Sequence, residues 1–191
     1  MKKLILLTTF LLPFIMFSQT QLGADINGEA SGDESGQSVS FSSDGTIVAI
    51  GARFNDGGGS SSGHVRVYQY SSGSWVKLGL DIDGEAASDN SGSSVSLSSD
   101  GTIVAIGAYA NDGGHVRVYQ YSSGSWVKLG LDIDGEAFSD QSGWSVSLSD
   151  DGTKVAIGAI GNDGGGSASG QVRVYSWNGS QWDQLGADIN G

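Results

Sequence analysis

The amino-acid sequence predicts an all-β fold, made of tandem four-stranded antiparallel sheets that stack as blades of a β-propeller. Two observations support this prediction. One segment of the sequence occurs three times in tandem, and each copy contains four extended segments separated by turn sequences. A third agrees with them, because no segment beyond the first 18 residues shows the periodicity of an amphipathic helix.

The spacing of equivalent glycines gives the period of the repeat. Gly79 and Gly130 are 51 residues apart (130 − 79), whereas Gly130 and Gly186 are 56 apart (186 − 130). Gly23 and Gly79 are also 56 apart (79 − 23), so the middle copy is five residues shorter, and the difference falls in one loop rich in glycine and serine. A unit that keeps its strands and varies one loop is typical of a repeated element that stacks on its neighbours.

The first copy shows what each unit is expected to form. Gln37–Ser43 alternates apolar and small polar residues, which predicts a strand with one buried face. Asp44-Gly45 predicts a tight turn, and Thr46–Ala52 is apolar on both faces, as in a strand at the middle of a packed sheet. After the variable loop, His64–Tyr70 and Ser74–Ile82 complete four antiparallel strands.

The copies divide the chain after its first 18 residues into three blades. We expect repeats throughout residues 19–191, with blades at about 33–84, 89–135 and 140–191. An extra strand is expected at Thr20–Ile26, which matches the end of the last copy. Because closed propellers have about 4–8 blades, three blades predict either a fragment of a longer protein or protomers that associate to complete a ring. We favour the fragment.

One tyrosine and one tryptophan recur in register in all three copies. They are Tyr68, Tyr119 and Tyr175, and Trp75, Trp126 and Trp182. Stacked sheets bury large side chains between them, so we expect these aromatic residues to pack between blades rather than to bind a ligand.

Residues 1–18 have the pattern of a secretory signal peptide. Lys2 and Lys3 precede an apolar run over Leu4–Phe17, and Ser18 provides a small residue at which cleavage can follow. The run is 14 residues long, shorter than the ~20 that a helix needs to span a bilayer; a retained anchor is the alternative. We therefore expect a secreted or surface-displayed protein, with no membrane insertion after the signal is removed.

The charge and the composition exclude several function classes. The chain has 9 basic and 21 acidic residues, a formal net charge of −12, which disfavours binding to nucleic acid and to anionic membranes. It contains no cysteine, so no disulfide, thiol nucleophile or zinc–thiolate site can form. The two histidines, His64 and His115, occupy equivalent positions in two copies and are expected to be exposed strand residues too far apart to share a metal. We predict no catalytic, cofactor-binding or metal-binding residues and no enzymatic activity, since every acidic cluster is repeated.

Three motifs in register resemble the FG-GAP repeats of integrin-α-type β-propellers, in particular the variant found in large secreted bacterial surface proteins. The motifs are S-G-x-S-V-S from Ser35, D-G-T-x-V-A-I-G-A from Asp44, and G-x-V-R-V-Y from Gly63, with their counterparts in the later copies. The resemblance implies a propeller that works outside the cell in binding or adhesion. The chain departs from the family in having Ser35-Gly36 instead of Phe-Gly, and Gly51-Ala52-Arg53 without the proline.

Calcium is the one cofactor that the resemblance raises. Many family members bind it in the first hairpin, but here that hairpin offers only Ser42, Ser43 and Asp44, too few oxygens for the six to eight ligands that Ca²⁺ takes. Acid-rich segments between blades are a weaker alternative, against the simpler interpretation of solvated turns. Their oxygen-bearing residues are Asp25, Asn27, Glu29 and Asp33; Asp81, Asp83, Glu85 and Asp89; and Asp132, Asp134, Glu136 and Asp140.

These observations favour a secreted or cell-surface, non-catalytic module for binding or adhesion. The variable loops Arg53–Gly63, Tyr109–Gly114 and Ile160–Gly170 are where we expect contacts with an extracellular protein or glycan, whose identity the sequence does not give. Two alternatives stay open: a structural spacer in a large extracellular protein, and the non-catalytic part of a truncated secreted enzyme.

Overall fold

The computed structural model describes residues 19–110 and 112–191, which form fifteen strands and no helix. This confirms the all-β prediction. The expected signal peptide, residues 1–18, lies outside the described residues. Within the described part of the chain, no helix has the length and apolar character needed to cross a membrane.

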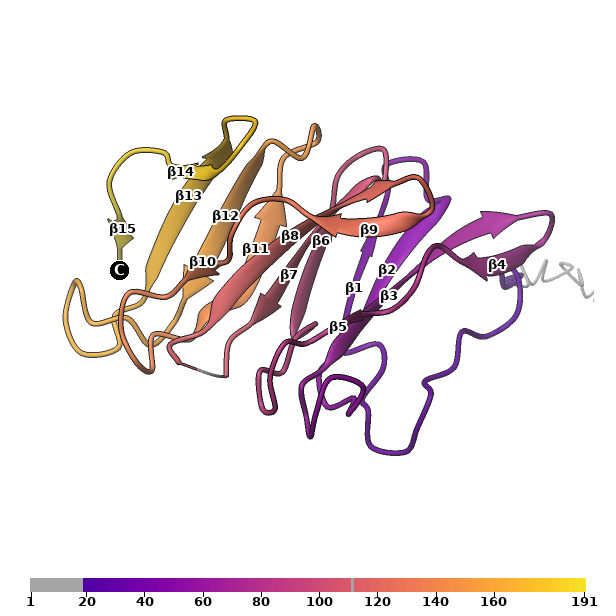
Figure 1. The fold of residues 1–191 in the computed structure, drawn as a ribbon, viewed down its shortest axis with the longest axis horizontal. Helices are drawn as coiled ribbons and strands as arrows, with labels where there is room; N and C mark the ends of the chain where they lie inside the picture. Colours follow the sequence, from indigo (N-terminus) through magenta and orange to yellow (C-terminus); the bar gives the residue numbers. More distant parts are fainter. Residues whose placement is uncertain (1–18, 111) are drawn as a thin grey trace, which may run out of the picture.

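The strands form three antiparallel sheets, which are stacked side by side along the chain as blades (Figure 1). Blade 1 contains β1 (Ser38–Phe41), β2 (Ile47–Ala52), β3 (His64–Ser71), β4 (Ser74–Lys77) and β5 (Ile82–Asp83). Blade 2 contains β6 (Ser94–Leu97), β7 (Ile103–Ala108), β8 (His115–Ser122), β9 (Ser125–Lys128) and β10 (Ile133–Asp134). Blade 3 contains β11 (Ser142–Leu148), β12 (Lys154–Ala159), β13 (Gln171–Trp177), β14 (Trp182–Gln184) and β15 (Ile189–Asn190).

The outer strand of each blade is interrupted, which corrects the prediction of one continuous strand over Ser74–Ile82. β4 pairs with the second half of β3 and β5 with its first two residues. Between them Gly79 has a φ of +79°, and a Cβ placed there would lie 3.0 Å from Cδ1 of Trp126 in the next blade. The same break occurs in blade 3 at Gly186, which has a φ of +80° and nothing within 4 Å of an added Cβ, so the break belongs to the repeat itself and leaves room for the indole ring of a following blade.

The expected extra strand at Thr20–Ile26 is wrong, because none of these residues belongs to a strand. The segment runs along blade 1 instead, where Trp75 Nε1 donates a hydrogen bond of 2.9 Å to the carbonyl of Leu22. The equivalent residues of later copies reach the sheet of the blade before them, as Ile82 does through Val65. A strand forms only beside another strand, and no blade precedes blade 1 in the described residues.

The hydrophobic core lies between the blades. We call the face that each blade turns toward the next its back face, and the opposite face its front face. Val65 and Val67 on the back face of blade 1 pack in one cluster with Val104 and Ile106 on the front face of blade 2. A second cluster joins blades 2 and 3 and includes Val116, Val118, Ile133, Val155, Ile157 and Tyr175. Because apolar burial is the main driving force of folding, the junctions rather than the separate sheets stabilise the molecule.

Close approach of the blades depends on small residues near the ends of the second strands. A Cβ on Gly51 would lie 2.0 Å from the carbonyl oxygen of Gly92 in the next blade, and one on Gly107 would lie 2.1 Å from that of Gly143. No side chain fits at these two positions without separating the blades. The glycine of the repeated A-I-G-A motif therefore has a packing role.

The stack has two different edges. The loop edge, at the bottom of Figure 1, holds the β2–β3 type loops and the connectors between blades; the turn edge, at the top, holds the tight Asp-Gly turns. We number the connectors by the blade whose front face they cover: connector 1 is residues 27–37, connector 2 is 84–93 and connector 3 is 135–141.

Candidate functional site

The connectors are fixed by one buried arginine in each blade. Arg117, on β8, donates from Nη2 to the carbonyl of Asp83 and to Ser91 Oγ, both at 3.0 Å, and from Nη1 to the Tyr119 hydroxyl at 2.9 Å. Its Nη1 also lies 3.4 Å from a carboxylate oxygen of Glu85. The guanidinium thus contacts three residues of the segment that enters blade 2 and one tyrosine of its own strand, and it ties that segment to the sheet.

The same arrangement occurs in the other blades. Arg66 Nη2 donates to the carbonyl of Asn27 at 2.8 Å, and Arg173 Nη2 donates to that of Asp134 at 2.6 Å. Glu29 and Glu136 are their carboxylate partners, at 3.5 and 3.8 Å. A group that appears three times in equivalent surroundings is part of the scaffold.

The last aspartate of each acid-rich segment is buried and accepts hydrogen bonds within the protein. Asp33 Oδ2 accepts from the amide of Ala30 at 3.1 Å and from Asn55 Nδ2 at 2.9 Å. Asp140 repeats this geometry with Asn162 Nδ2 at 3.0 Å, and Asp89 accepts from a backbone amide at 2.8 Å. These carboxylates close the connector turns, and those of Asp33 and Asp140 also attach the variable loops, which accounts for their presence without a cation.

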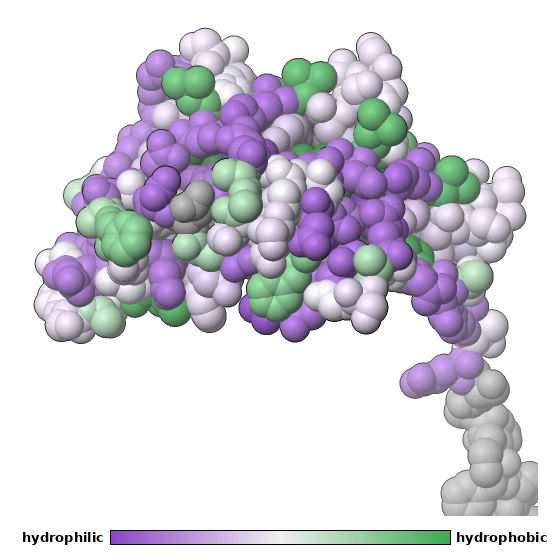
Figure 2. All heavy atoms as spheres, turned by 60° about the horizontal axis from the view of Figure 1, so that its bottom comes forward, coloured by the Kyte–Doolittle hydropathy of each residue, from purple (hydrophilic) through white to green (hydrophobic). Residues whose placement is uncertain are grey.

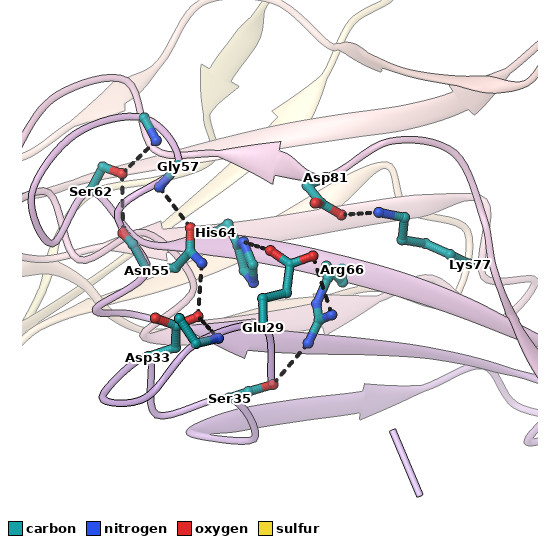
Figure 3. A network of polar contacts seen from close by, with 12 residues as sticks. Glu29, Asp33, Ser35, Asn55, Gly57, Ser62, His64, Arg66, Lys77 and Asp81 are labelled. Carbon is teal, nitrogen blue, oxygen red and sulfur yellow. Dashed lines mark hydrogen bonds and ion pairs between the residues drawn. The ribbon is translucent and has the colours of Figure 1, made fainter. Parts of the chain in front are cut away.

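Figure 3 shows a polar network where connector 1 crosses β3, with Glu29 between His64 and Arg66. Ligand atoms of Glu29, His64 and Asp81 all lie within 4.8 Å of one another, a spacing that would suit a metal. However, Arg66 lies 3.5 Å from Glu29, and Lys77 lies 2.8 Å from Asp81. Both carboxylates are already balanced by cations, so the network is better explained as part of the scaffold.

The structure corrects the expected exposure of His64, whose side chain is only 1% exposed. Burial is the main cause that lowers its pKa, with a smaller contribution from the charge of Arg66, so the ring is neutral at physiological pH. Its Nδ1 lies 4.0 Å from Glu29. In blade 3 the equivalent Gln171 donates to Glu136 at 3.0 Å, so an amide replaces the imidazole beside the same carboxylate.

The Asp-Gly turns at the turn edge use their carboxylates internally. In the first hairpin, Asp44 Oδ1 accepts from Ser42 Oγ at 2.7 Å and from the amide of Thr46 at 2.9 Å. In blade 3 the same bonds, from Ser149 first and then from Thr153, lower the pKa of Asp151 to about 2. The hydrogen bonds stabilise the ionised carboxylate, which fixes the turn.

The copies differ most visibly at the loop edge between blades 2 and 3, where three aromatic residues replace residues of other kinds. Tyr109 stands where the other copies have Arg53 and Ile160. Phe138 aligns with Ser31 and Ala87, and Trp144 aligns with Gln37 and Ser93. We call Tyr109, Phe138 and Trp144 the aromatic cluster.

The aromatic cluster is open to solvent. The rings of Tyr109 and Trp144 lie 4.7 Å apart, centroid to centroid, with 56° between their planes. Phe138 is 82% exposed and Trp144 is 44% exposed. A hollow of about 200 Å³ is lined by Tyr109, Ala110, Gly113, Phe138, Ser139 and Gln141. Exposed aromatic side chains around a depression are typical of binding sites.

A larger and more polar hollow of about 610 Å³ lies beside blade 1, between connector 1 and the loop Arg53–Gly63. Residues 29–33 form one wall, and Phe54 and Asn55 are part of the other. Figure 2, which brings the loop edge forward, shows a mainly hydrophilic surface interrupted by separate hydrophobic side chains.

Sequence reasoning named the loop that contains Tyr109 but missed Phe138 and Trp144. Both residues align with a position of the other two copies, where the residue is small or polar instead of aromatic. That departure was visible in the aligned copies. Their proximity to Tyr109 was not, because the ring contact joins a loop of blade 2 to β11 of blade 3.

Comparison with protein families gives one match, to the FG-GAP repeat, over residues 132–175. Residues 132–175 thus resemble an FG-GAP repeat. The matched stretch begins just before β10, includes connector 3 and ends in β13, so the FG-GAP unit is offset from the blade. Blades 1 and 2 contain the same motifs in register. No curated protein shows significant sequence similarity to the chain.

Solved structures share the fold of the three stacked blades at low sequence identity. A candidate 6-phosphogluconolactonase from Bacteroides uniformis superposes with a TM-score of 0.57 at 13% identity, over 80% of this chain and 39% of that one. Sqt1 from Saccharomyces cerevisiae gives 0.53 at 14%, over 83% and 36%. Hydrazine synthase from Kuenenia stuttgartiensis gives 0.51 at 11%, over 91% and 40%. The chain thus spans about two-fifths of the length of each, and the likeness shows the propeller-like fold alone.

Proposed function

We propose that this FG-GAP protein is a non-catalytic binding module, secreted or displayed at the cell surface. It contacts an extracellular protein or glycan through the aromatic cluster at the loop edge. The observation that carries the proposal is the gathering of three aromatic side chains, unique to one junction, on an otherwise repeated scaffold.

A non-catalytic role is supported by how the polar groups are used. The arginines, the connector aspartates and His64 are buried or paired within the scaffold, and each arrangement recurs in at least one other blade. A catalytic site normally needs an asymmetric set of groups with access to substrate. The acidic clusters lack that asymmetry.

A binding role is supported by the chemistry of the aromatic cluster. Tyrosine and tryptophan offer large apolar faces with a polar group at one end, and they dominate the energetics of many interfaces. Phe138 is too exposed to contribute much to the core. The strongly negative net charge favours a neutral or basic partner over an acidic one.

The test compares the chain with a variant whose cluster is replaced by residues from its own copies. Tyr109→Arg, Phe138→Ala and Trp144→Ser each introduce the residue found at the equivalent position of blade 1 or of the segment entering blade 2. Binding is measured on a glycan array and on a panel of extracellular proteins, and hits are quantified in solution. We expect saturable binding that the triple variant weakens about 100-fold, equivalent to about 3 kcal/mol.

Leu131→Ala is the matched control, since Leu131 is 84% exposed but lies outside the cluster. It is expected to bind like the unmodified chain. Binding that survives the triple substitution contradicts the proposed site. Silence on both arrays favours the spacer, and turnover of a substrate would favour the enzyme alternative. Export is tested separately, by sequencing the N-terminus of the protein recovered outside the cell.

A further inference from the structure

The two ends of the stack expose faces that are covered elsewhere in the chain. On the front face of blade 1, Phe41 is 56% exposed, whereas its counterpart Leu97 is 7% exposed beneath blade 1. On the back face of blade 3, Ile189 is 60% exposed, whereas its counterpart Ile133 is 5% exposed. In the middle of the stack, apolar residues at these positions pack against a neighbouring blade. The two terminal blades each lack one such neighbour among the described residues, so their apolar side chains are exposed.

Polar groups at the ends match each other as well. At both internal junctions a serine hydroxyl of one blade donates to a glycine carbonyl of the next: Ser38 to Gly92, and Ser94 to Gly143, each at 2.7 Å. The next members of this series are Ser145 on blade 3 and the carbonyl of Gly36 on blade 1.

Two further inter-blade bonds follow the same rule. The amides of Leu97 and Leu148 donate to Ser40 Oγ and Ser96 Oγ, at 3.0 and 2.9 Å. The amides of Ser43 and Ser99 donate to the carbonyls of Ser99 and Asp150, both at 2.8 Å. At a further junction of the same kind, the Phe41 amide of blade 1 would donate to Ser147 Oγ of blade 3. The Asp150 amide would be the partner of the Ser43 carbonyl. The back face of blade 3 therefore complements the front face of blade 1, group by group.

One substitution adds charge complementarity. Ile47 and Ile103 each pack on the glycine of the next blade's Asp-Gly turn, Gly101 and Gly152. In blade 3 the equivalent residue is Lys154, which is exposed. A further junction of the same kind sets this lysine beside an Asp-Gly turn and its carboxylate.

The same seven residues, L-G-A-D-I-N-G, occur at Leu22–Gly28 and at Leu185–Gly191. At an internal junction the equivalent segment makes two sets of contacts: Ile82 pairs with Val65 of blade 1, and the Leu78 carbonyl accepts from Trp126 Nε1 of blade 2. Each terminal heptapeptide makes half of them. Among the described residues, Leu22–Gly28 is hydrogen-bonded to the front of blade 1, and Leu185–Gly191 to β13 and the Gly170 carbonyl. One copy of the segment is enough for one junction.

We propose that a second copy of this chain docks head to tail, with the front face of blade 1 of each copy on the back face of blade 3 of the other. At each new junction Leu22–Gly28 of the incoming copy replaces Leu185–Gly191 beside β13. Two copies form two equal junctions and a closed ring of six blades, within the range of about 4–8 that closed propellers use.

The test is the mass of the purified chain by sedimentation equilibrium over a wide concentration range. We expect one discrete species with twice the mass of the single chain, which is 19.6 kDa before residues 1–18 are removed. Phe41→Asp and Val172→Asp place a charge on the front and the back face respectively, and each is expected to weaken association about 100-fold or more. Leu131→Asp, at an exposed position away from both faces, is the control that stays dimeric.

Mixing the two variants gives a sharper result. Phe41→Asp keeps an intact back face and Val172→Asp an intact front face, so the mixture regains one of two junctions and associates where each variant alone does not. A monomer at every concentration, a ladder of higher oligomers, or a dimer that tolerates both substitutions would overturn the proposal.

Segment exchange has its own test. If Leu22–Gly28 replaces the last heptapeptide, Ile26→Asp weakens the dimer about tenfold or more while Ile189→Asp leaves it unchanged. The reverse result overturns the exchange. Association is independent of the proposed ligand site, because Phe138→Ala and Trp144→Ser lie at an internal junction and are expected to leave the mass unchanged.

Discussion

The junction between blades 1 and 2 and the junction between blades 2 and 3 have the same scaffold but different surfaces. Both bury valine and isoleucine between sheets, and both fix a connector with one arginine. At the loop edge, however, the first junction presents Arg53, Ala87 and Ser93, and the second presents Tyr109, Phe138 and Trp144. The repeat keeps what stacks the blades and varies what faces the solvent, so differences between copies indicate function better than their shared residues do.

The largest effect is expected in the shared core. Ile106→Ala and Ile157→Ala each remove a fully buried side chain, one at each junction. Each is expected to lower the free energy of unfolding by about 3 kcal/mol. Chemical denaturation followed by tryptophan fluorescence measures both. Losses that differ by more than about 1 kcal/mol would show that the two junctions are not energetically equivalent.

A somewhat smaller effect is expected at the connector arginines. Arg117→Lys keeps the charge but loses the fork that binds Asp83, Ser91 and Tyr119, so we expect a loss of about 2 kcal/mol. Arg66→Lys is the matched variant in blade 1, and it is expected to cost less because the described hydrogen bonds of Arg66 go to the Asn27 carbonyl and, at 3.4 Å, to Ser35 Oγ, with none to a tyrosine hydroxyl. Equal losses in denaturation would mean that the bond from Arg117 to the Tyr119 hydroxyl adds nothing to stability.

Transplanting the aromatic cluster tests whether the two junctions differ only at their surface. Arg53→Tyr, Ala87→Phe and Ser93→Trp together give the first junction the residues of the second. We expect the number of bound ligands per chain to rise from one to two, with stability changed by less than about 1 kcal/mol. Isothermal titration with the ligand found on the arrays measures the stoichiometry. A stoichiometry that stays at one would show that further residues of the second junction are required.

The smallest effect concerns the turn edge. Ser149→Ala removes a hydrogen bond from Asp151 and is expected to raise the pKa of that carboxyl from about 2 toward its ordinary value of 3.8. A depressed folded pKa contributes stability that is present above 3.8 and is lost as the pH falls toward 2. The variant therefore loses less stability over this range. NMR titration of the carboxyl gives the pKa, and an unchanged value would assign the shift to Thr153.

Local sequence patterns predicted most of the scaffold. The alternation in Gln37–Ser43, the Asp44-Gly45 turn and the apolar run Thr46–Ala52 correspond to β1, a turn and β2. These features depend on neighbours in the chain, and a sequence displays such neighbours directly. The prediction that the recurring tryptophans pack between blades also agrees with the structure for two of them, since Trp126 and Trp182 each pack against the core of a junction.

Most of the errors involve contacts between distant segments. The break at Gly79 is the exception, because it recurs at Gly186 with no blade beside it; Thr20–Ile26 forms no strand because it has none beside it. His64 is buried by connector 1, which is remote in sequence. The aromatic cluster combines three positions whose proximity follows only from the stacking of blades.

The offset between the FG-GAP unit and the blade has a consequence for how such a gene can change length. Each segment that joins two blades pairs with the sheet of the first and is bonded by the arginine of the second, so removing or adding one whole period keeps these partners at every remaining internal junction. Unequal recombination between the repeated copies would thus lengthen or shorten the array by single blades while keeping the pairing at each junction. The length and curvature of the array can change with the number of repeats, while a new binding surface can arise through a few substitutions in one repeat.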